Sequence, residues 1–150
     1  MTPPAQPLND RGIMILSGAM DRLVPPIDDL PGAGRMGLAS EVDVLAGKHA
    51  PYQRSLSIFI EKLATRWSAE LPDSEKDGLL RDLENADGAT FNAVLELVYL
   101  AYYGDPRVHG RVGWRGGPLQ PEGFPLPPFN AEILQAVRER PPFWRPIQAR

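Results

Sequence analysis

The stretch PYQRSLSIFIEKLATRW, residues 51–67, decides the fold. Its apolar side chains recur at positions i, i+3, i+4, i+7, i+8 and i+11, which is the period of one helical face. They are Leu56, Phe59, Ile60, Leu63, Ala64 and Trp67. Charged residues such as Glu61 and Lys62 fall outside this stripe, and Pro51 suits a first helical position. The segment is therefore predicted to be an amphipathic helix whose stripe packs in a core.

Two predicted helices precede this segment. The first is expected to start at a cap, Asn9 or Asp10, and to stop at the Pro25-Pro26 pair. A second, short helix is expected over residues 36–46.

Two further helices are predicted after it. The fourth is expected to open within Leu71-Pro72-Asp73-Ser74, where Ser74 has capping-box spacing with Asp77. The fifth is expected to start at Asp87 or Thr90 and to end at Gly104.

The fifth helix carries more apolar residues than one face can hold. Its main stripe is Phe91, Val94, Leu95, Val98 and Tyr102. Leu97 and Leu100 widen the apolar surface of the helix, so we expect this helix to be the central one.

The chain as a whole is predicted to be all-α, since no segment has the alternating pattern of a strand. We expect a compact bundle of about five to six helices within one domain, residues 1–150. The helical body is expected to cover residues 9–104. An extended Pro/Gly-rich arm with a short last helix, capped by Asn130, is expected over 105–150.

Large aromatic residues are concentrated on this arm. They are Trp114, Phe124, Phe129, Phe143 and Trp144. Such residues dominate binding interfaces, and proline lowers the entropy lost when an extended arm is ordered. Two interpretations stay open: the aromatic groups anchor a partner, or the arm folds back and seals the helical body. Tyr102, Tyr103 and Asp105 are predicted to fix the turn that launches the arm.

Composition excludes several functional classes. The 150 residues carry a formal net charge of -3, which disfavours nucleic-acid binding. The absence of cysteine excludes disulfides, iron–sulfur ligation and thiolate zinc sites within the chain. The only histidines are His49 and His109, so no metal site is expected.

No catalytic set is found in the sequence. Asp28 and Asp29 are adjacent, but Asp is a common turn residue and a solvated turn is the better interpretation. Catalytic, cofactor-binding and metal residues are therefore all predicted to be absent. An enzyme that uses Tyr102, Asp105 and His109 remains a weaker alternative, as does a stand-alone helical protein that binds a small molecule or regulates another protein.

Two motifs resemble a known family. They are MDRLVPP (20–26) with LPGA (30–33), and LAYYGDPRV (100–108) followed by GW (113–114) and GFP (123–125). In this order they are similar to the gluconate 2-dehydrogenase subunit 3 family over most of the chain. The family's closing Gly-Tyr-Pro is Gly123-Phe124-Pro125 here, so one tyrosine hydroxyl is missing.

The resemblance implies a non-catalytic small subunit with a chaperone-like role. Such a subunit binds a large flavoprotein of the glucose–methanol–choline oxidoreductase family and supports its folding, stability or export. The partner would hold FAD and oxidise a sugar, sugar acid or other alcohol. No nucleic acid and no membrane insertion are expected of this chain.

The location of the complex is predicted from the N-terminal residues. Residues 1–10 contain neither a twin-arginine pair nor a basic stretch followed by an apolar core. We therefore expect a cytoplasmic protein. A periplasmic location is the alternative, if a signal is carried by the partner or lies outside this sequence.

Overall fold

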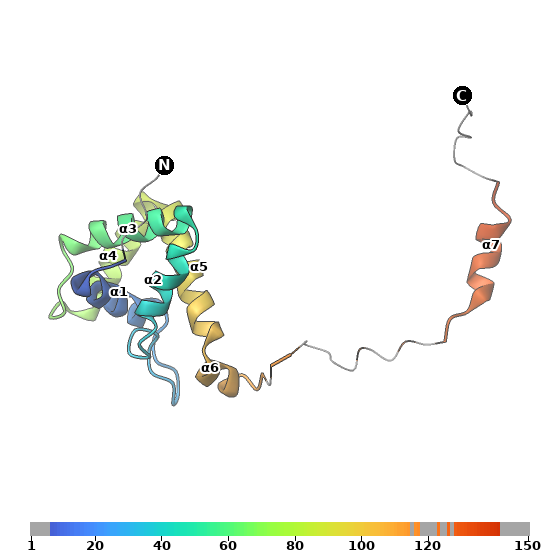
Figure 1. Ribbon diagram of the computed structural model, residues 1–150, viewed down its shortest axis with the longest axis horizontal. Coiled ribbons are helices and arrows are strands. Elements are labelled where there is room, and N and C mark those ends of the chain that lie inside the picture. The colour runs from blue at the N-terminus through green and yellow to red at the C-terminus, as the bar shows by residue number, and fades with distance from the viewer. Residues whose placement is uncertain (1–6, 115, 118–122, 124–125, 127, 142–150) are drawn as a thin grey trace, which may run out of the picture. The chain divides into compact units, whose positions relative to one another are not determined.

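The computed structural model describes residues 7–114, 116, 117, 123, 126 and 128–141 (Figure 1). Over these residues the chain forms seven α-helices and one short 3-10 helix, and it has no strand. The all-α prediction is therefore confirmed. Two compact units are present, Met1–Gly116 and Gly117–Arg150, and each is described by itself.

Six helices build the first unit. They are α1 (Asp10–Leu23), α2 (Ala39–Gly47), α3 (Ala50–Ala64), α4 (Asp73–Ala86), α5 (Gly88–Gly104) and α6 (Pro106–Arg111). Helix α5 packs against α2, α3, α4 and α6, so it is the central helix of the unit, as its apolar residues predicted.

All six helices contribute side chains to the core of this unit. Its largest fully buried side chains are Phe59, Leu16, Met20, Leu56, Leu97, Val42, Val94, Val98 and Val108. The ring centroids of Phe59 in α3 and Phe91 in α5 lie 6.3 Å apart. The predicted stripe of α3 is buried except for Ala64, which is half-buried, and the helix ends at Ala64 so that Trp67 packs from the loop that follows.

The connector between α1 and α2 is seated tightly on α1. A Cβ atom at Gly34 would lie 1.8 Å from the carbonyl oxygen of Ser17, so only glycine fits there. The amide of Ala33 donates to the carbonyl of Val24 at 3.1 Å, and the amide of Arg35 donates to the Asp21 carboxylate at 3.0 Å. The first of the two family-like motifs therefore has a structural role in this chain.

One predicted helix start and one predicted capping box differ from the structure. Helix α2 begins at Ala39 rather than near residue 36, because residues 34–38 form turns. Helix α4 begins at Asp73 after Pro72, and no side chain caps it. Asp77 does not complete a capping box with Ser74, because its carboxylate binds Arg22 of α1 instead.

The second unit contains the short last helix that was expected. The Asn130 side chain accepts a hydrogen bond from the amide of Glu132 at 2.9 Å and caps the 3-10 helix η1 (Ala131–Leu134). The chain then continues into α7 (Gln135–Arg138). All described side chains of this unit are exposed.

Candidate interaction surface

Helix α5 has a buried face and an exposed apolar face. Leu97 is 1% exposed, whereas Leu100 is 54% exposed and Tyr103 is 59% exposed. Leu97 and Leu100 both widen the apolar surface of the helix, and the structure places them on different faces of it. A helix that is apolar on all sides is normally enclosed by other protein segments. The exposed half of α5 has no such segment packed on it in this unit.

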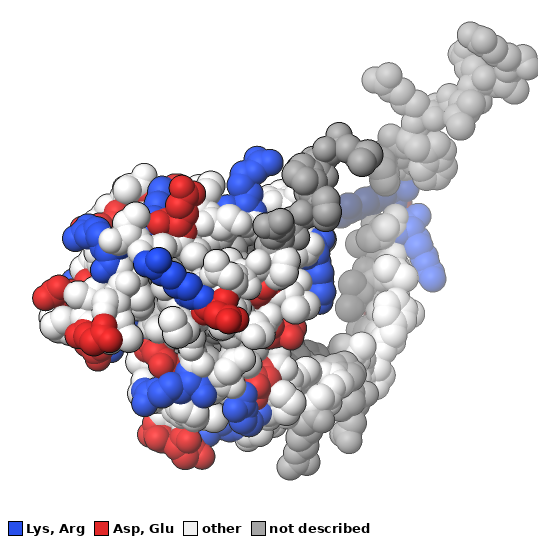
Figure 2. Space-filling view, turned by 60° about the vertical axis from the view of Figure 1, so that its left-hand side comes forward, with Lys and Arg blue, Asp and Glu red and all other residues white. Residues whose placement is uncertain are grey.

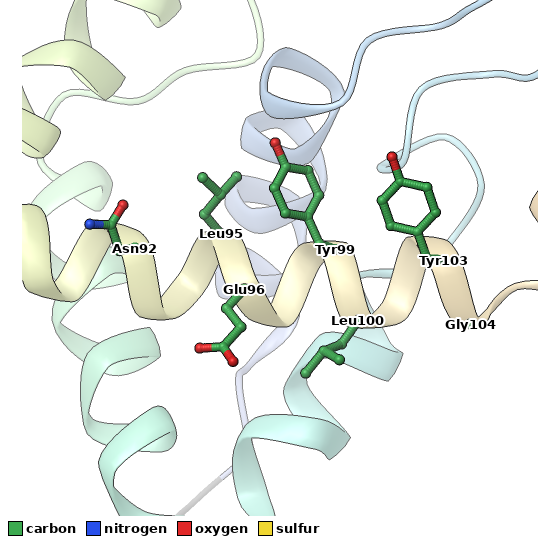
Figure 3. A pocket seen from close by; sticks show the side chains of 7 residues that line it. All are labelled: Asn92, Leu95, Glu96, Tyr99, Leu100, Tyr103 and Gly104. Atoms are coloured by element: carbon green, nitrogen blue, oxygen red, sulfur yellow. The ribbon is translucent and has the colours of Figure 1, made fainter. Parts of the chain in front are cut away.

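The exposed face forms a shallow groove of about 590 Å³ (Figure 3). It is lined by Asn92, Leu95, Glu96, Tyr99, Leu100, Tyr103 and Gly104. These residues recur three or four positions apart, so they share one side of α5. Figure 3 shows Tyr99 and Tyr103 projecting in the same direction one turn apart, and their ring centroids are 6.1 Å from each other. We call Leu95, Tyr99, Leu100 and Tyr103 the α5 surface.

The carboxylate in this groove already has a hydrogen-bond donor. The hydroxyl of Tyr52 in α3 donates to Glu96 at 2.7 Å, and this hydrogen bond raises the pKa of Tyr52 above its usual value. Glu96 is thereby partnered within the fold, and the remainder of the groove is mostly apolar. Such a surface is suited to apolar and aromatic contact.

A polar corner joins α5 to α6. The Asp105 carboxylate caps α6 by accepting from the amide of Arg107 at 2.8 Å. The Arg107 guanidinium also donates to Asp105, which holds the pKa of that carboxyl below its usual value. Nη2 of Arg107 also donates to the carbonyl of Met36 at 3.0 Å. The next residue of α6, Val108, is buried in the core. Asp105 therefore fixes a turn as predicted, but the turn launches α6 and not the arm.

Helix α6 holds a further exposed aromatic group, Trp114, beyond this corner. The Nε2 of His109 donates to the carbonyl of Tyr103 at 2.5 Å. The ring of His109 meets that of Trp114 edge-to-face, with centroids 4.2 Å apart. The amide of Trp114 donates to the His109 carbonyl at 2.9 Å. Trp114 is thus held beside α6, with 41% of its surface exposed.

The predicted interface residues have different environments. Tyr103 and Trp114 lie on the exposed surface, whereas Tyr102 is buried in the core, and the rings of Tyr102 and Tyr103 meet edge-to-face. Phe129 is 75% exposed in the second unit. Phe124, Phe143 and Trp144 lie outside the described residues. Leu95, Tyr99 and Leu100 were not among the predicted interface residues. Apolar residues on every side of α5 indicate a need for cover on all faces, but they do not show which face is left exposed.

The residues considered for catalysis have structural partners. Arg111 of α6 forms ion pairs with both Asp28 and Asp29, and so ties α6 to the turn between α1 and α2. His109 and Asp105 make the contacts described above. Among the described residues, no group of three or more His, Asp or Glu side chains could hold a metal ion.

Charged residues are mixed on the surface. Figure 2 shows Lys and Arg interspersed with Asp and Glu over the face in view, without a large patch of one sign. In the described part of the chain, no helix is both long and apolar enough to cross a bilayer. Comparisons with protein-family models, curated proteins and solved structures found no match to this chain.

Proposed function

We propose that this protein is a non-catalytic small subunit that binds a larger protein through the α5 surface. One observation carries the proposal: the central helix of the fold exposes Tyr99, Leu100 and Tyr103 together. Tyrosine is enriched in interface hot spots, because it adds a large contact area with few rotatable bonds.

The rigidity of α5 favours this role. The opposite face of the helix is fixed by Val94, Leu97 and Val98, which are at most 1% exposed. The α5 surface is therefore ordered before a partner arrives, and little conformational entropy is lost when the partner binds.

The second unit supplies further candidate contacts. Leu126, Phe129 and Ile133 are each at least 70% exposed, so the unit has no core of its own among its described residues. Segments of this kind gain stability when they are ordered on another protein. We propose that the arm adds a second contact with the same partner.

The proposed partner is a large FAD-dependent alcohol or sugar dehydrogenase, or a related oxidase. This part of the proposal is supported by the resemblance of residues 20–33 and 100–125 to the gluconate 2-dehydrogenase subunit 3 family. In that complex the partner holds FAD and carries out the oxidation. The small subunit stabilises the partner and helps its maturation.

A stand-alone binding protein is the alternative function. The groove on α5, at about 590 Å³, has the volume of a typical small-molecule site. Its lining comes from one helix, however, and enclosed ligand sites usually draw on several elements.

Co-purification tests the proposal. The tagged chain is expressed in its native cell, and the co-eluting proteins and the visible spectrum are recorded. We expect a large oxidoreductase and the absorption of bound flavin. A colourless chain that elutes alone would contradict the proposal and favour the stand-alone protein.

A matched pair of variants tests the surface. Leu100→Ser with Tyr103→Ser should abolish the complex. Met14→Ser in α1 should retain it, because Met14 is 68% exposed but lies on another helix. Equal recovery of the partner with both variants would show that the α5 surface is not the interface.

A further inference from the structure

A second cleft lies on the helical body, between α1 and the loop of residues 65–72 that joins α3 to α4. Its volume is about 440 Å³, and its residues come from three elements: α1, this loop and α4. It shares no residue with the groove on α5. This volume is within the range of small-molecule sites, toward the lower end.

The wall of this cleft is apolar and partly aromatic. Trp67 packs against α1 at Gly18, where an added Cβ atom would lie 3.1 Å from Cζ2 of the indole. The indole is thereby held in place, with only 9% of Trp67 exposed. Met14 is 68% exposed and also lines the cleft. Its flexible side chain can adapt to ligands of different outline.

Two cations line the same cleft, and their described hydrogen bonds go to neutral acceptors. The Arg11 guanidinium donates to the carbonyl of Ala64 at 2.9 Å, and the Lys76 ammonium donates to the carbonyl of Ala69 at 2.9 Å. These bonds position the two groups without neutralising their charge. A guanidinium has five N–H donors and an ammonium has three, so both retain donors for a ligand.

One carboxylate offsets part of this charge. Glu70 accepts a hydrogen bond from the Ser68 hydroxyl, which holds the pKa of Glu70 below its usual value, with a further contribution from Lys76. Glu70 is therefore ionised near neutral pH. Two positive groups against one negative group leave the lining with a net charge of about +1, which favours an anion.

We propose that this cleft binds a small amphiphilic anion with an aromatic body, such as an aromatic carboxylate. The ring system would contact Trp67 and Met14, and the carboxylate would lie within reach of Arg11 and Lys76. Contacts between flat rings and an indole, together with charge-assisted hydrogen bonds, would give both affinity and orientation. This site is independent of the proposed subunit role, because it uses neither α5 nor the arm.

The test is an NMR titration of the full ¹⁵N-labelled chain with 1-naphthoate, and with 1-naphthalenemethanol as an uncharged control of similar shape. We expect shifts at the Trp67 indole N–H and the Gly18 amide. We also expect at least about tenfold weaker binding of the alcohol. Absence of binding, shifts centred on Tyr99 and Tyr103, or equal affinity for acid and alcohol would overturn the proposal.

Two variants sharpen the result. Arg11→Gln with Lys76→Gln should weaken naphthoate binding about tenfold and leave the alcohol unaffected, since only the charge is removed. Leu100→Ser should leave both affinities unchanged. The comparison of acid with alcohol on the unmodified chain decides the outcome even if the double variant fails to fold.

Discussion

The guanidinium of Arg22 donates to both carboxylate oxygens of Asp77, from Nε at 2.7 Å and from Nη2 at 3.0 Å. A third bond, from Nη1 to Asp73 at 2.6 Å, joins the same arginine to the first turn of α4. Arg22 lies near the end of α1, so this network fastens the two helices together. Paired hydrogen bonds of this kind are stronger and more directional than a single ion pair.

The first prediction concerns stability in acid. Arg22 holds the pKa of Asp77 below its usual value, so the ion pair contributes its full stability above about pH 4 and loses it as the pH falls through the lower folded-state pKa. Asp77→Asn should therefore lower the free energy of unfolding by about 1 kcal/mol at neutral pH, with a smaller difference in acid.

Urea denaturation at a series of pH values measures this effect. Arg22→Gln should reduce the same pH dependence, because it removes the cause of the lowered pKa. A stability difference between Asp77→Asn and the original chain that does not change with pH would contradict the assignment.

The second prediction compares two glycines. Gly34→Ala should cost at least about 3 kcal/mol, because the added methyl group would overlap the Ser17 backbone and neither backbone can move away cheaply. Gly78→Ala should stabilise the protein by about 0.5–1 kcal/mol, because Gly78 is inside α4 and a Cβ there meets nothing within 4 Å. Thermal unfolding of the two variants should show shifts of opposite sign.

The third prediction separates the two faces of α5. Leu97→Ala should destabilise the fold by roughly 2–5 kcal/mol, since it removes a buried side chain from the core. Leu100→Ala should change the free energy of unfolding by no more than about 0.5 kcal/mol. A large loss for Leu100→Ala in the isolated chain would mean that this side chain is covered in solution.

The fourth prediction concerns truncation. A chain ending at Gly116 should keep the unfolding midpoint of the full chain, because it retains the complete first unit. A chain ending at Gly104 should lose roughly 2 kcal/mol or more, since it lacks the buried Val108 and the bond from Arg107 to Met36. Equal midpoints for the two truncated chains would show that α6 does not stabilise the body.

The fold was predictable where local pattern and tertiary packing agree. The apolar stripe identified α3, and the capping and terminating residues identified α5, because local signals and tertiary packing agree for both helices. The capping box of α4 was mispredicted, because Asp77 binds an arginine 55 positions away and no local rule reports that bond. Helix α6 was missed although Asp105-Pro106 is a good cap and first-turn pair, because the glycines after it suggested irregular chain.

The candidate site was predictable only in part. Aromatic side chains directed attention to the arm, and Trp114 does lie on an exposed surface of the body. The exposed half of α5 could not be distinguished from its buried half by sequence, because leucines occur on both halves. Periodicity does not show which face of a helix other helices pack against. The cleft beside Trp67 depends on contacts between α1 and a loop about 50 positions away, which no sequence pattern encodes.

Helix α5 is both the centre of the core and the proposed binding surface, so binding of a partner depends on the subunit being folded. The helix is held by α2, α3, α4 and α6, so its exposed side chains adopt their spacing only when the whole body is folded. A partner that recognises this spacing would bind the native chain and ignore the unfolded one. By mass action, such a partner raises the free energy of unfolding of the small subunit, and the effect grows with the logarithm of the free partner concentration once that concentration exceeds the dissociation constant. An unassembled copy lacks this protection and would be the first to be degraded, which would keep the two proteins in balance.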